Sequence, residues 1–412
     1  MKLKSLSVKN FKSFKEMNIE LKDFNVVIGA NASGKSNFVQ VFKFLRDIIN
    51  LGLENAVSIQ GDIEYLTNLK EGQGEELSIG IVCEIEDDGK FANTKQNIEM
   101  TFHEMKYEFS LKEKKGSPGF KIVNDCLLLK FKFKDENGKI IEGEIRLSHK
   151  KDKLVYEIFP KGIEDKVASL VPLLYLKMDS LPQNLLLIQT PLFFIWRRLT
   201  IDDIFRNISI YDFEPKKSKE AAPITGKAEL EENGSNLAKV VKNILENEEK
   251  RRKLFNLVSD ILPFVNNLFV EKLPDKSLLF KLQESYFEKK DIPASLLSDG
   301  TINVIAMIIA LYFEKKKFVI FEEPERNIHP FLISKVIEMM KEISRKKQII
   351  VTTHNPEVVK YAGIDNLLLV SRGRDGFSRI YRPLEKDQIK IFLENDLGIE
   401  ELFIQNLLEV GA

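Results

Sequence analysis

The stretch Gly29-Ala30-Asn31-Ala32-Ser33-Gly34-Lys35-Ser36 decides the fold of this chain. It fits the pattern G-x-x-x-x-G-K-[ST], in which glycines let the backbone curl until its N–H groups point at phosphate oxygens. Residues 24–28 before it are an apolar run typical of a buried strand, and residues 37–49 after it carry apolar side chains at helical spacing. The start of such a helix adds a dipole that favours an anion. The motif therefore predicts a nucleotide site, in which Lys35 neutralises the β- and γ-phosphates and the Ser36 hydroxyl binds Mg²⁺.

Length and composition indicate a globular protein of two or three domains. The chain has 412 residues, of which 43% are hydrophobic and 30% are charged. Lys+Arg and Asp+Glu number 62 each, so the chain as a whole is not a general polyanion binder, although local basic patches remain possible. Two cysteines, Cys83 and Cys126, exclude a disulfide framework and fit a reducing compartment. The apolar runs are shorter than the roughly 20 residues that cross a bilayer, so we expect a cytoplasmic protein with no membrane partner.

A second helix start with anion-binding character lies far downstream. Ser298, Asp299 and Gly300 precede an apolar run at residues 302–313 that is typical of a buried helix. A serine and a glycine at such a position leave backbone N–H groups available to an anion. On its own this segment is more often a simple helix cap, so its meaning depends on the strands that come after it in the chain.

Two apolar strands then end in polar residues. The run at residues 318–323 ends in Glu322 and Glu323, and the run at residues 348–353 is followed by His354. In a parallel α/β sheet, chemistry lies at the carboxyl ends of the strands. Adjacent carboxylates there suit a magnesium ligand and a base that orients water, and a histidine can reach a γ-phosphate. Each feature alone is common in ordinary proteins, but their order along the chain predicts one ATPase site.

The whole set resembles an ABC-type ATPase of the RecF/SMC/OLD-like group, the prokaryotic AAA-type ATP-binding proteins. Its parts are Walker A at 29–36, a signature motif at 297–301, Walker B at 318–323 and the switch histidine at 354. Segments typical of that branch are similar too, namely "NFKSF" at 10–14, "GKSN" at 34–37, "DGSNLA" within 230–237, "DEPE…IHP" at 322–330 and "TTHSP" at 352–356. The chain departs from the usual pattern at Glu322, where Asp is common, and at Asp299, where Gly is common. Gln60 and Gln189 both remain candidates for the Q-loop glutamine.

The resemblance implies a fold, cofactors and residue roles. We expect an α/β P-loop NTPase of ABC/RecF/SMC type with an antiparallel β-lobe and an inserted helical region, binding ATP and Mg²⁺. Ser36 and Glu322 would hold the metal, while Lys35, Glu323 and His354 would be catalytic. The nucleotide would be contacted by Gly29, Ala30, Asn31, Ala32, Ser33, Gly34, Lys35, Ser36, Asn37, Lys12 and Ser13, and in trans by Ser298, Asp299 and Gly300.

The same resemblance implies partners. Because the signature motif acts on the nucleotide of a second copy, we expect an ATP-dependent homodimer. Too few residues follow His354 for the Toprim nuclease domain of OLD proteins, so we expect a separately encoded nuclease or other effector, in anti-phage defence or genome maintenance. Two alternatives remain open. The chain could be a scaffold that binds ATP without hydrolysing it, which the departures at Glu322 and Asp299 favour, or a transporter ATPase subunit, which its long insert disfavours.

The pattern divides the chain into four parts. We expect an ATPase lobe with Walker A and the β-lobe at 1–160, a mostly helical insert at 161–293, a second ATPase lobe at 294–383 and a helical tail at 384–412. In the first part, residues 127–133, 140–147 and 153–159 alternate as antiparallel strands do, with an Asn-Gly turn at 137–138. In the insert we expect helices at residues 167–177, 192–208 and 237–262.

Two basic clusters are candidate nucleic-acid contacts. Lys130, Lys132 and Lys134 alternate on an expected strand and therefore share one face, and residues 250–253 read Lys-Arg-Arg-Lys. Either cluster could bind the phosphate backbone of DNA or RNA, with a steep dependence on salt. Either could equally be an ordinary solvated surface.

Overall fold

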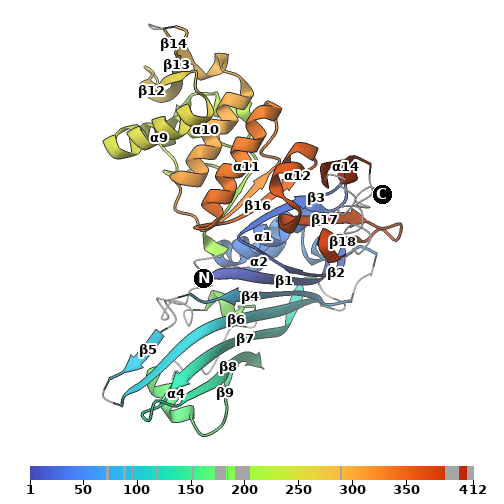
Figure 1. Cartoon of the computed structure of the whole chain (residues 1–412). Helices are drawn as coiled ribbons and strands as arrows, with labels where there is room; N and C mark the ends of the chain where they lie inside the picture. The colour runs from blue at the N-terminus through green and yellow to red at the C-terminus, as the bar shows by residue number, and fades with distance from the viewer. Residues whose placement is uncertain are drawn as a thin grey trace.

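One large mixed sheet carries most of the fold (Figure 1). The computed structural model describes residues 1–70, 74–86, 90–94, 96–114, 116, 118–150, 153–171, 182, 184–190, 205–287, 290–385 and 399–405. Within this part of the chain the sheet has 14 strands, in the order β10-β15-β16-β3-β17-β18-β2-β1-β4-β6-β7-β8-β9, with β5 paired to β6. The fold is therefore α/β with an antiparallel extension, as the sequence predicted.

The first five strands of that order are parallel. They are β10 (Ile208–Tyr211), β15 (Phe318–Glu322), β16 (Gln348–Thr353), β3 (Phe24–Ile28) and β17 (Leu367–Arg372). Their side chains are almost all buried, as expected for strands covered on both faces. Because the strands are parallel, the Walker A loop after β3, the carboxylates after β15 and the histidine after β16 lie at one edge of the sheet.

The rest of the sheet is the antiparallel β-lobe, apart from the parallel junction of β18 with β2. Its strands are β18 (Ser378–Tyr381), β2 (Phe14–Glu20), β1 (Lys2–Phe11), β4 (Leu77–Glu84), β5 (Lys90–Asn93), β6 (Ile98–Glu113), β7 (Phe120–Lys134), β8 (Ile140–Lys150) and β9 (Lys153–Phe159). The three predicted antiparallel strands are confirmed as parts of β7, β8 and β9. The first of them begins seven residues earlier than the alternation suggested, at Phe120.

Helices cover both faces of the parallel strands. On one side α1 (Lys35–Leu51) packs against the sheet, with the ring centroids of Phe42 and Phe318 5.3 Å apart. On the other side lie α10 (Asp299–Tyr312), α11 (Pro330–Ser344) and α12 (Pro356–Ala362). Alternate residues of one strand enter the two cores, as Ile320 does on the α1 side and Phe321 on the α10 side. Residues 301–311 of α10 are all buried, so this helix is surrounded on every side.

Within its described residues, the region 161–293 holds strands as well as helices, which corrects the prediction of a mostly helical insert. It holds the edge strand β10 and a separate four-stranded sheet. The strands of that sheet are β11 (Ala222–Pro223), β12 (Val265–Lys272), β13 (Ser277–Glu284) and β14 (Asp291–Pro293), and α8 (Leu237–Leu245) and α9 (Glu248–Ile261) pack on it. The other helices of the region are α4 (Glu164–Leu170), which lies against β5 and β6, and α7 (Pro215–Ser218), which contacts α10. The predicted helix at 237–262 is two helices, because α8 ends at Leu245 and Asn247 accepts a hydrogen bond from the Lys250 N–H to cap the second.

Two other predicted helices are only partly within the described residues. The helix expected at 167–177 is seen as α4, which begins at Glu164, and residues 172–177 lie outside the described part. Most of the helix expected at 192–208 also lies outside it, and its last residue, Ile208, begins strand β10. In the tail, α14 (Ile399–Ile404) is helical as expected.

The remaining short elements are α2 (Leu53–Ile59), α3 (Ile63–Leu66) and the 3-10 turns η3 (Leu187–Gln189), η4 (Ala294–Leu296), η5 (Ile364–Asn366) and η6 (Pro383–Glu385). Among the described helices, none combines the length and apolarity needed to span a bilayer.

Candidate nucleotide site

The Walker A loop joins β3 to α1 in a conformation that requires its glycines. Gly34 has φ 117°, and a Cβ placed there would lie 2.3 Å from the Ser378 hydroxyl oxygen. A Cβ on Gly29 would lie 2.4 Å from the carbonyl oxygen of Val370. The loop is therefore clamped against β17 and β18, and only glycine fits at these two positions.

Lys35 is folded onto this loop. Its ammonium group donates hydrogen bonds to the carbonyl oxygens of Gly29, at 2.6 Å, and Ala30, at 3.0 Å. Burial lowers the pKa of Lys35, and the nearby charges of Glu323 and Glu325 oppose that shift. The lysine thus sits inside the loop with its charge facing two carboxylates. Ser36 lies exposed in the first turn of α1.

The tip of the β1–β2 hairpin touches the same loop. Asn37 donates a hydrogen bond from its amide nitrogen to the Ser13 hydroxyl at 2.8 Å. The hydroxyl of Ser378 is 2.8 Å from that of Ser13 and 2.6 Å from the carbonyl oxygen of Ser33. The predicted neighbourhood of Ser13 and Walker A is therefore present, and Ser378 is a member that no sequence pattern indicated.

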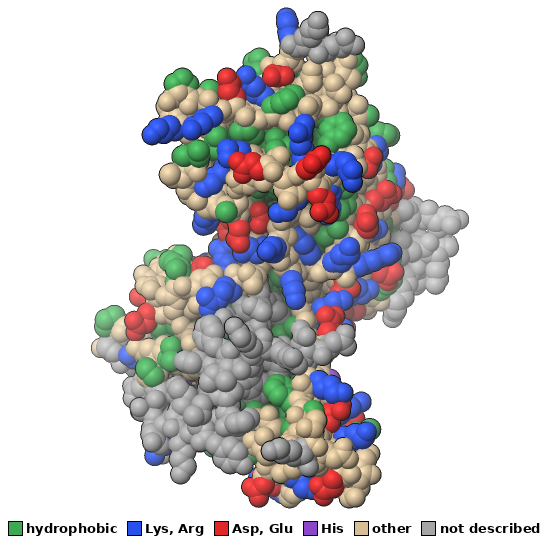
Figure 2. Space-filling model, turned by 90° about the vertical axis from the view of Figure 1, so that its left-hand side faces the viewer, with side chains coloured by type: hydrophobic (Ala, Val, Ile, Leu, Met, Phe, Trp, Pro, Cys, Tyr) green, Lys and Arg blue, Asp and Glu red, His purple; other side chains and the backbone are tan. Residues whose placement is uncertain are grey.

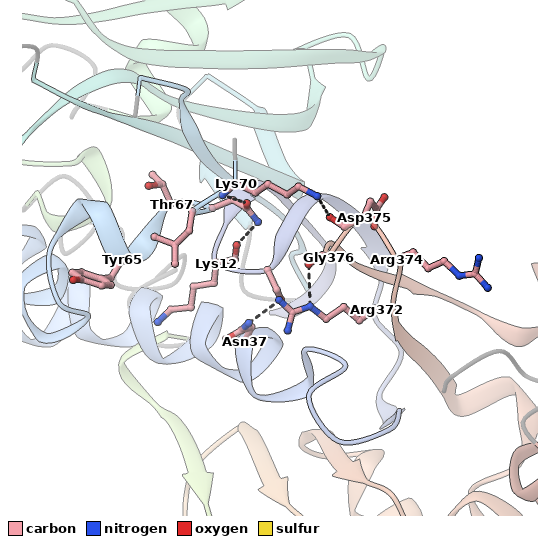
Figure 3. A pocket seen from close by; sticks show the side chains of 12 residues that line it. Lys12, Asn37, Tyr65, Thr67, Lys70, Arg372, Arg374, Asp375 and Gly376 are labelled. Atoms are coloured by element: carbon pink, nitrogen blue, oxygen red, sulfur yellow. Dashed lines mark hydrogen bonds between the residues drawn. The ribbon is translucent and has the colours of Figure 1, made fainter. Parts of the chain in front are cut away.

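A basic pocket opens beside this tip (Figure 3). It has a volume of about 430 Å³ and is lined by Lys12, Lys70, Arg372, Arg374 and other residues. Burial lowers the pKa of Lys12, whose backbone has φ 47°. The pocket thus extends from the Walker A helix to these basic side chains, and their positive charge suits a ligand that carries phosphates.

Glu323 and His354 meet, although 31 positions separate them in the sequence. One carboxylate oxygen of Glu323 is 2.9 Å from His354 Nδ1, and the other accepts a hydrogen bond from Arg326 Nε at 2.8 Å. Burial alone would raise the pKa of Glu323, but these two hydrogen bonds and the charges behind them hold it below the ordinary value. Glu323 has φ 46°, a strained backbone conformation for a non-glycine residue.

Glu322 points to a different partner. Its carboxylate is 3.2 Å from the ammonium group of Lys43, which lies on α1 about two turns after Ser36. Lys43 was not anticipated from the sequence, because the pair joins residues 279 positions apart. The carboxylate at the Walker B position therefore lies against the helix that carries Ser36.

Glu325 is a further acidic residue of the site. It is 7% exposed and accepts a hydrogen bond from the Thr353 hydroxyl, while its second oxygen has no partner among the described residues. Burial raises the pKa of Glu325. The Ser33 hydroxyl in the Walker A loop is also buried, and it has no hydrogen-bond partner among the described residues. Unsatisfied oxygens beside Lys35 and Ser36 fit a site for a metal-bound triphosphate.

The signature residues form the start of α10. The Ser298 hydroxyl accepts a hydrogen bond from the Thr301 N–H at 3.1 Å and so caps the helix. A Cβ on Gly300 would lie 2.4 Å from the carbonyl oxygen of Asn327, so the helix start abuts the loop after β15. Asp299 forms an ion pair of 2.5 Å with Lys219, the residue that follows α7.

Two models of known protein families match this chain, one in its N-terminal part and one in its C-terminal part. Residues 1–178 match a family model described as an AAA ATPase domain, and residues 195–360 match one described as an AAA domain, putative AbiEii toxin, Type IV TA system. The fold is that of a crystal structure of the SmcHead bound to the C-winged helix domain of ScpA, with a TM-score of 0.50 and 16% identity over 92% of this chain and 98% of that one. The two AAA ATPase domain matches and this SMC-head fold support the resemblance to RecF/SMC/OLD-like ABC-type ATPases.

Other proteins resemble this ATPase more partially or more distantly. The SMC head domain from Thermotoga maritima has a TM-score of 0.45 and 16% identity, covering 93% of this chain and 99% of that one. Endonuclease GajA from Bacillus cereus (strain VD045) is 43% identical over 47 residues. That match spans 11% of the ATPase and 8% of the endonuclease.

The two Q-loop candidates of the ATPase contact different parts of α1 from outside that helix. Gln60 donates a hydrogen bond to the side-chain oxygen of Gln40 at 3.1 Å, near the start of the helix. Gln189 donates to the carbonyl oxygen of Ile48 at 3.3 Å, near its end. The position of Gln60 is the closer of the two to Walker A along this helix.

The two basic clusters of the ATPase differ in their neighbours. On β7, Lys130 pairs with Glu104 at 2.6 Å and Lys132 with Glu142 at 3.7 Å, so glutamates of β6 and β8 balance this face. On α9, Arg251 and Arg252 line a groove of about 420 Å³ together with Glu248 and with two asparagines near the start of β12, and neither arginine forms an ion pair with that glutamate in the described part of the chain. Acidic and basic side chains are similarly interspersed on the face shown in Figure 2. The α9 cluster is thus the better candidate for an anionic ligand.

Proposed function

We propose that the protein hydrolyses ATP in a homodimer that places one nucleotide between each Walker A loop and the signature motif of the other copy. The observation that carries this proposal is the convergence of Lys35, Glu323 and His354 from three neighbouring parallel strands. Lys35 would bind the β- and γ-phosphates, Glu323 would accept a proton from the attacking water, and His354 would contact the γ-phosphate.

Ser36 and Glu322 would hold Mg²⁺, which when bound supplies charge neutralisation on the phosphate oxygens. In the absence of the metal, the ammonium group of Lys43 balances the carboxylate charge of Glu322. Residues 29–34 and Asn37 would surround the phosphates with backbone and side-chain donors. Lys12 and Ser13 would lie beside the nucleotide, since the basic pocket continues from the Walker A helix.

Ser298, Asp299 and Gly300 would complete the site from the partner copy. The α10 start presents N–H groups and a helix dipole suited to a terminal phosphate. Asp299 is 38% exposed in its side chain, so this helix start is accessible to a second molecule. ATP would then hold the two copies together, and loss of the γ-phosphate would release them.

Replacing Glu323 with glutamine tests the hydrolysis step. We expect single-turnover hydrolysis to fall by about 10²–10³, the scale of losing one group that acts in the transition state, while ATP binding persists. Glu338→Gln, an exposed residue of α11, is the matched control and should hydrolyse ATP at the wild-type rate. Equal rates for wild type and Glu323→Gln would instead favour the scaffold that binds ATP without hydrolysing it.

We further propose that the dimer gates a separately encoded nuclease or another effector acting on DNA or RNA, in anti-phage defence or genome maintenance. The short match to an endonuclease and the resemblance to that group of ATPases support this setting. Purification of the protein from its native cell, with and without a non-hydrolysable ATP analogue, should recover the effector in one nucleotide state only. Recovery of a membrane permease would favour the transporter alternative.

The α9 groove is the proposed nucleic-acid contact. Reversing the charge of Arg251 and Arg252 should weaken binding to DNA or RNA and reduce its salt dependence. The same reversal at Lys130 and Lys132, which glutamates already neutralise, should change binding little. Equal effects at the two sites would contradict this assignment.

A further inference from the structure

Arg326 touches three parts of the site at once. Its Nε donates to Glu323 at 2.8 Å, and one of its terminal nitrogens donates to Asp212 at 3.0 Å. Its carbonyl oxygen accepts a hydrogen bond of 2.8 Å from the amide of Asn303 on α10. The residue therefore connects the proposed catalytic carboxylate, the end of strand β10 and the signature helix.

Two side chains hold the carboxylate of Glu323, which is 21% exposed in its side chain. His354 lies against one carboxylate oxygen and Arg326 against the other, so each oxygen already has a partner. A carboxylate that is to take a proton from water needs an oxygen within hydrogen-bond reach of that water. Each oxygen can accept a second hydrogen bond, but withdrawal of one partner would leave an oxygen free to face the water. Arg326, 45% exposed in its side chain, can move without a large change in solvation.

Asp212 offers Arg326 a second place to bind. It is 51% exposed in its side chain and already bonded to the guanidinium group. A guanidinium group has five N–H donors in a planar fork, so Arg326 can leave Glu323 and remain paired with Asp212. Such a move keeps the guanidinium charge balanced throughout.

The loop that carries Arg326 is coupled to the signature helix and is strained. The Gly300 position abuts the carbonyl oxygen of Asn327, and Asn303 holds the preceding carbonyl. Both Glu323 and Asn327 have positive φ, 46° and 62°. The side-chain oxygen of Asn303 is buried and has no partner among the described residues, so a shifted loop could gain a hydrogen bond there.

We propose that Arg326 is a latch on Glu323, which docking of the partner's nucleotide on the α10 start releases towards Asp212. Arg326 is then a positioning residue, since it acts on the reaction through Glu323. The inference rests on the proposed function, because it takes Glu323 as the group that accepts the proton from water. The latched arrangement slows hydrolysis until the two copies have met.

Two substitutions with opposite expected signs test the latch in the full-length protein. In single-turnover hydrolysis with protein in excess, Arg326→Gln should raise the rate about threefold to tenfold, because one oxygen of Glu323 is freed. Asp212→Asn should lower it by a similar factor, because Arg326 then has only Glu323 to hold. The double variant should match Arg326→Gln. Arg345→Gln, at the exposed end of α11, is the control and should match wild type.

The binding affinities provide a readout that separates a latch from a purely structural role. Arg326 contacts Glu323 and Asp212 rather than the residues proposed to bind the phosphates. Arg326→Gln should therefore change the hydrolysis rate at saturating ATP and leave the dissociation constants of ATP and of the dimer unchanged. Lower rates in both single variants, or a changed rate with equally changed affinities, would overturn the latch while Glu323→Gln still fails to hydrolyse. Equal rates for wild type and Glu323→Gln would overturn the proposed function and the latch with it.

Discussion

Replacing Lys219 with methionine should weaken the ATP-dependent dimer. The negative charge of Asp299 is then no longer neutralised, and it lies where the proposed interface binds phosphate. Asp299 stands in the first turn of α10, between two proposed phosphate donors, and its 2.5 Å pair with Lys219 neutralises it. The lysine side chain is 16% exposed and keeps its apolar stem against the fold. Methionine preserves that stem and removes only the charge.

The size of the effect follows from the separation of the charges. A carboxylate about 6 Å from one phosphate charge, at an effective dielectric constant of about 20–40, is repelled by about 1.5–3 kcal/mol. The pair is partly exposed, so we take the lower end. A symmetric dimer contains this contact twice, which makes about 3 kcal/mol and a dissociation constant about 100-fold higher.

Sedimentation with a non-hydrolysable ATP analogue measures this constant, and a second substitution identifies its cause. Asp299→Asn should dimerise at least as well as wild type, and the double variant should return to within a few-fold of wild type. Lys217→Met, an exposed α7 residue that pairs with Glu214, should have no effect. If the double variant stays as weak as Lys219→Met, neutralisation of Asp299 is not what Lys219 provides, and the reasoning fails.

Two further predictions concern stability. Gly300→Ala should cost about 1–3 kcal/mol in urea unfolding, because its Cβ would meet the Asn327 carbonyl oxygen at 2.4 Å and force α10 away from that loop. Burial raises the pKa of Asp125 to about 7, against the opposing hydrogen bonds from the Leu187 N–H and Tyr107. The folded protein therefore holds this proton more tightly than the unfolded chain, and the stability it contributes falls by about 4 kcal/mol as pH rises from about 4 to 7. Asp125→Asn should remove this pH dependence of stability. As pH rises, the urea midpoint of wild type should therefore fall relative to that of the variant. Midpoints that change in parallel with pH would contradict the assignment.

The parts of the site that the sequence predicted are those set by local pattern. Glycine and lysine spacing specifies the Walker A loop without knowledge of its neighbours, and an apolar run followed by Glu323 or His354 specifies a strand end. Because both strands are parallel, their ends had to lie at one edge, and the contact between Glu323 and His354 is a consequence. Local signals were also present where the prediction was wrong. Asn247 followed by two glutamates is a helix start, and it divides the single helix predicted at 237–262 into two.

The missed residues share a different property. Ser378 meets Ser13 across 365 positions and Lys43 meets Glu322 across 279, so each contact depends on the register of elements far apart in the chain. Nothing in the sequence around Lys43 distinguishes it from any solvated helical lysine. Arg326 is nearer, three residues after Glu323, but its role appears only when Asp212 arrives from β10 on the neighbouring strand.

Walker B and the signature helix lie close together, so in the proposed dimer a ligand at the start of α10 can act directly on the loop that carries Glu323. The surface that would receive the partner's phosphate is the start of α10, and the next contact inward is the loop from Glu323 to Asn327. A displacement of that helix start by a fraction of an ångström must move the loop, because a packed contact with no space for a Cβ cannot absorb it. The same loop carries the proposed catalytic carboxylate at one end. One rigid contact therefore links binding of the partner's nucleotide to the chemistry at Glu323. A substitution at Asn303 should break this link, so that sedimentation still shows the ATP-dependent dimer while its single-turnover hydrolysis stays slow.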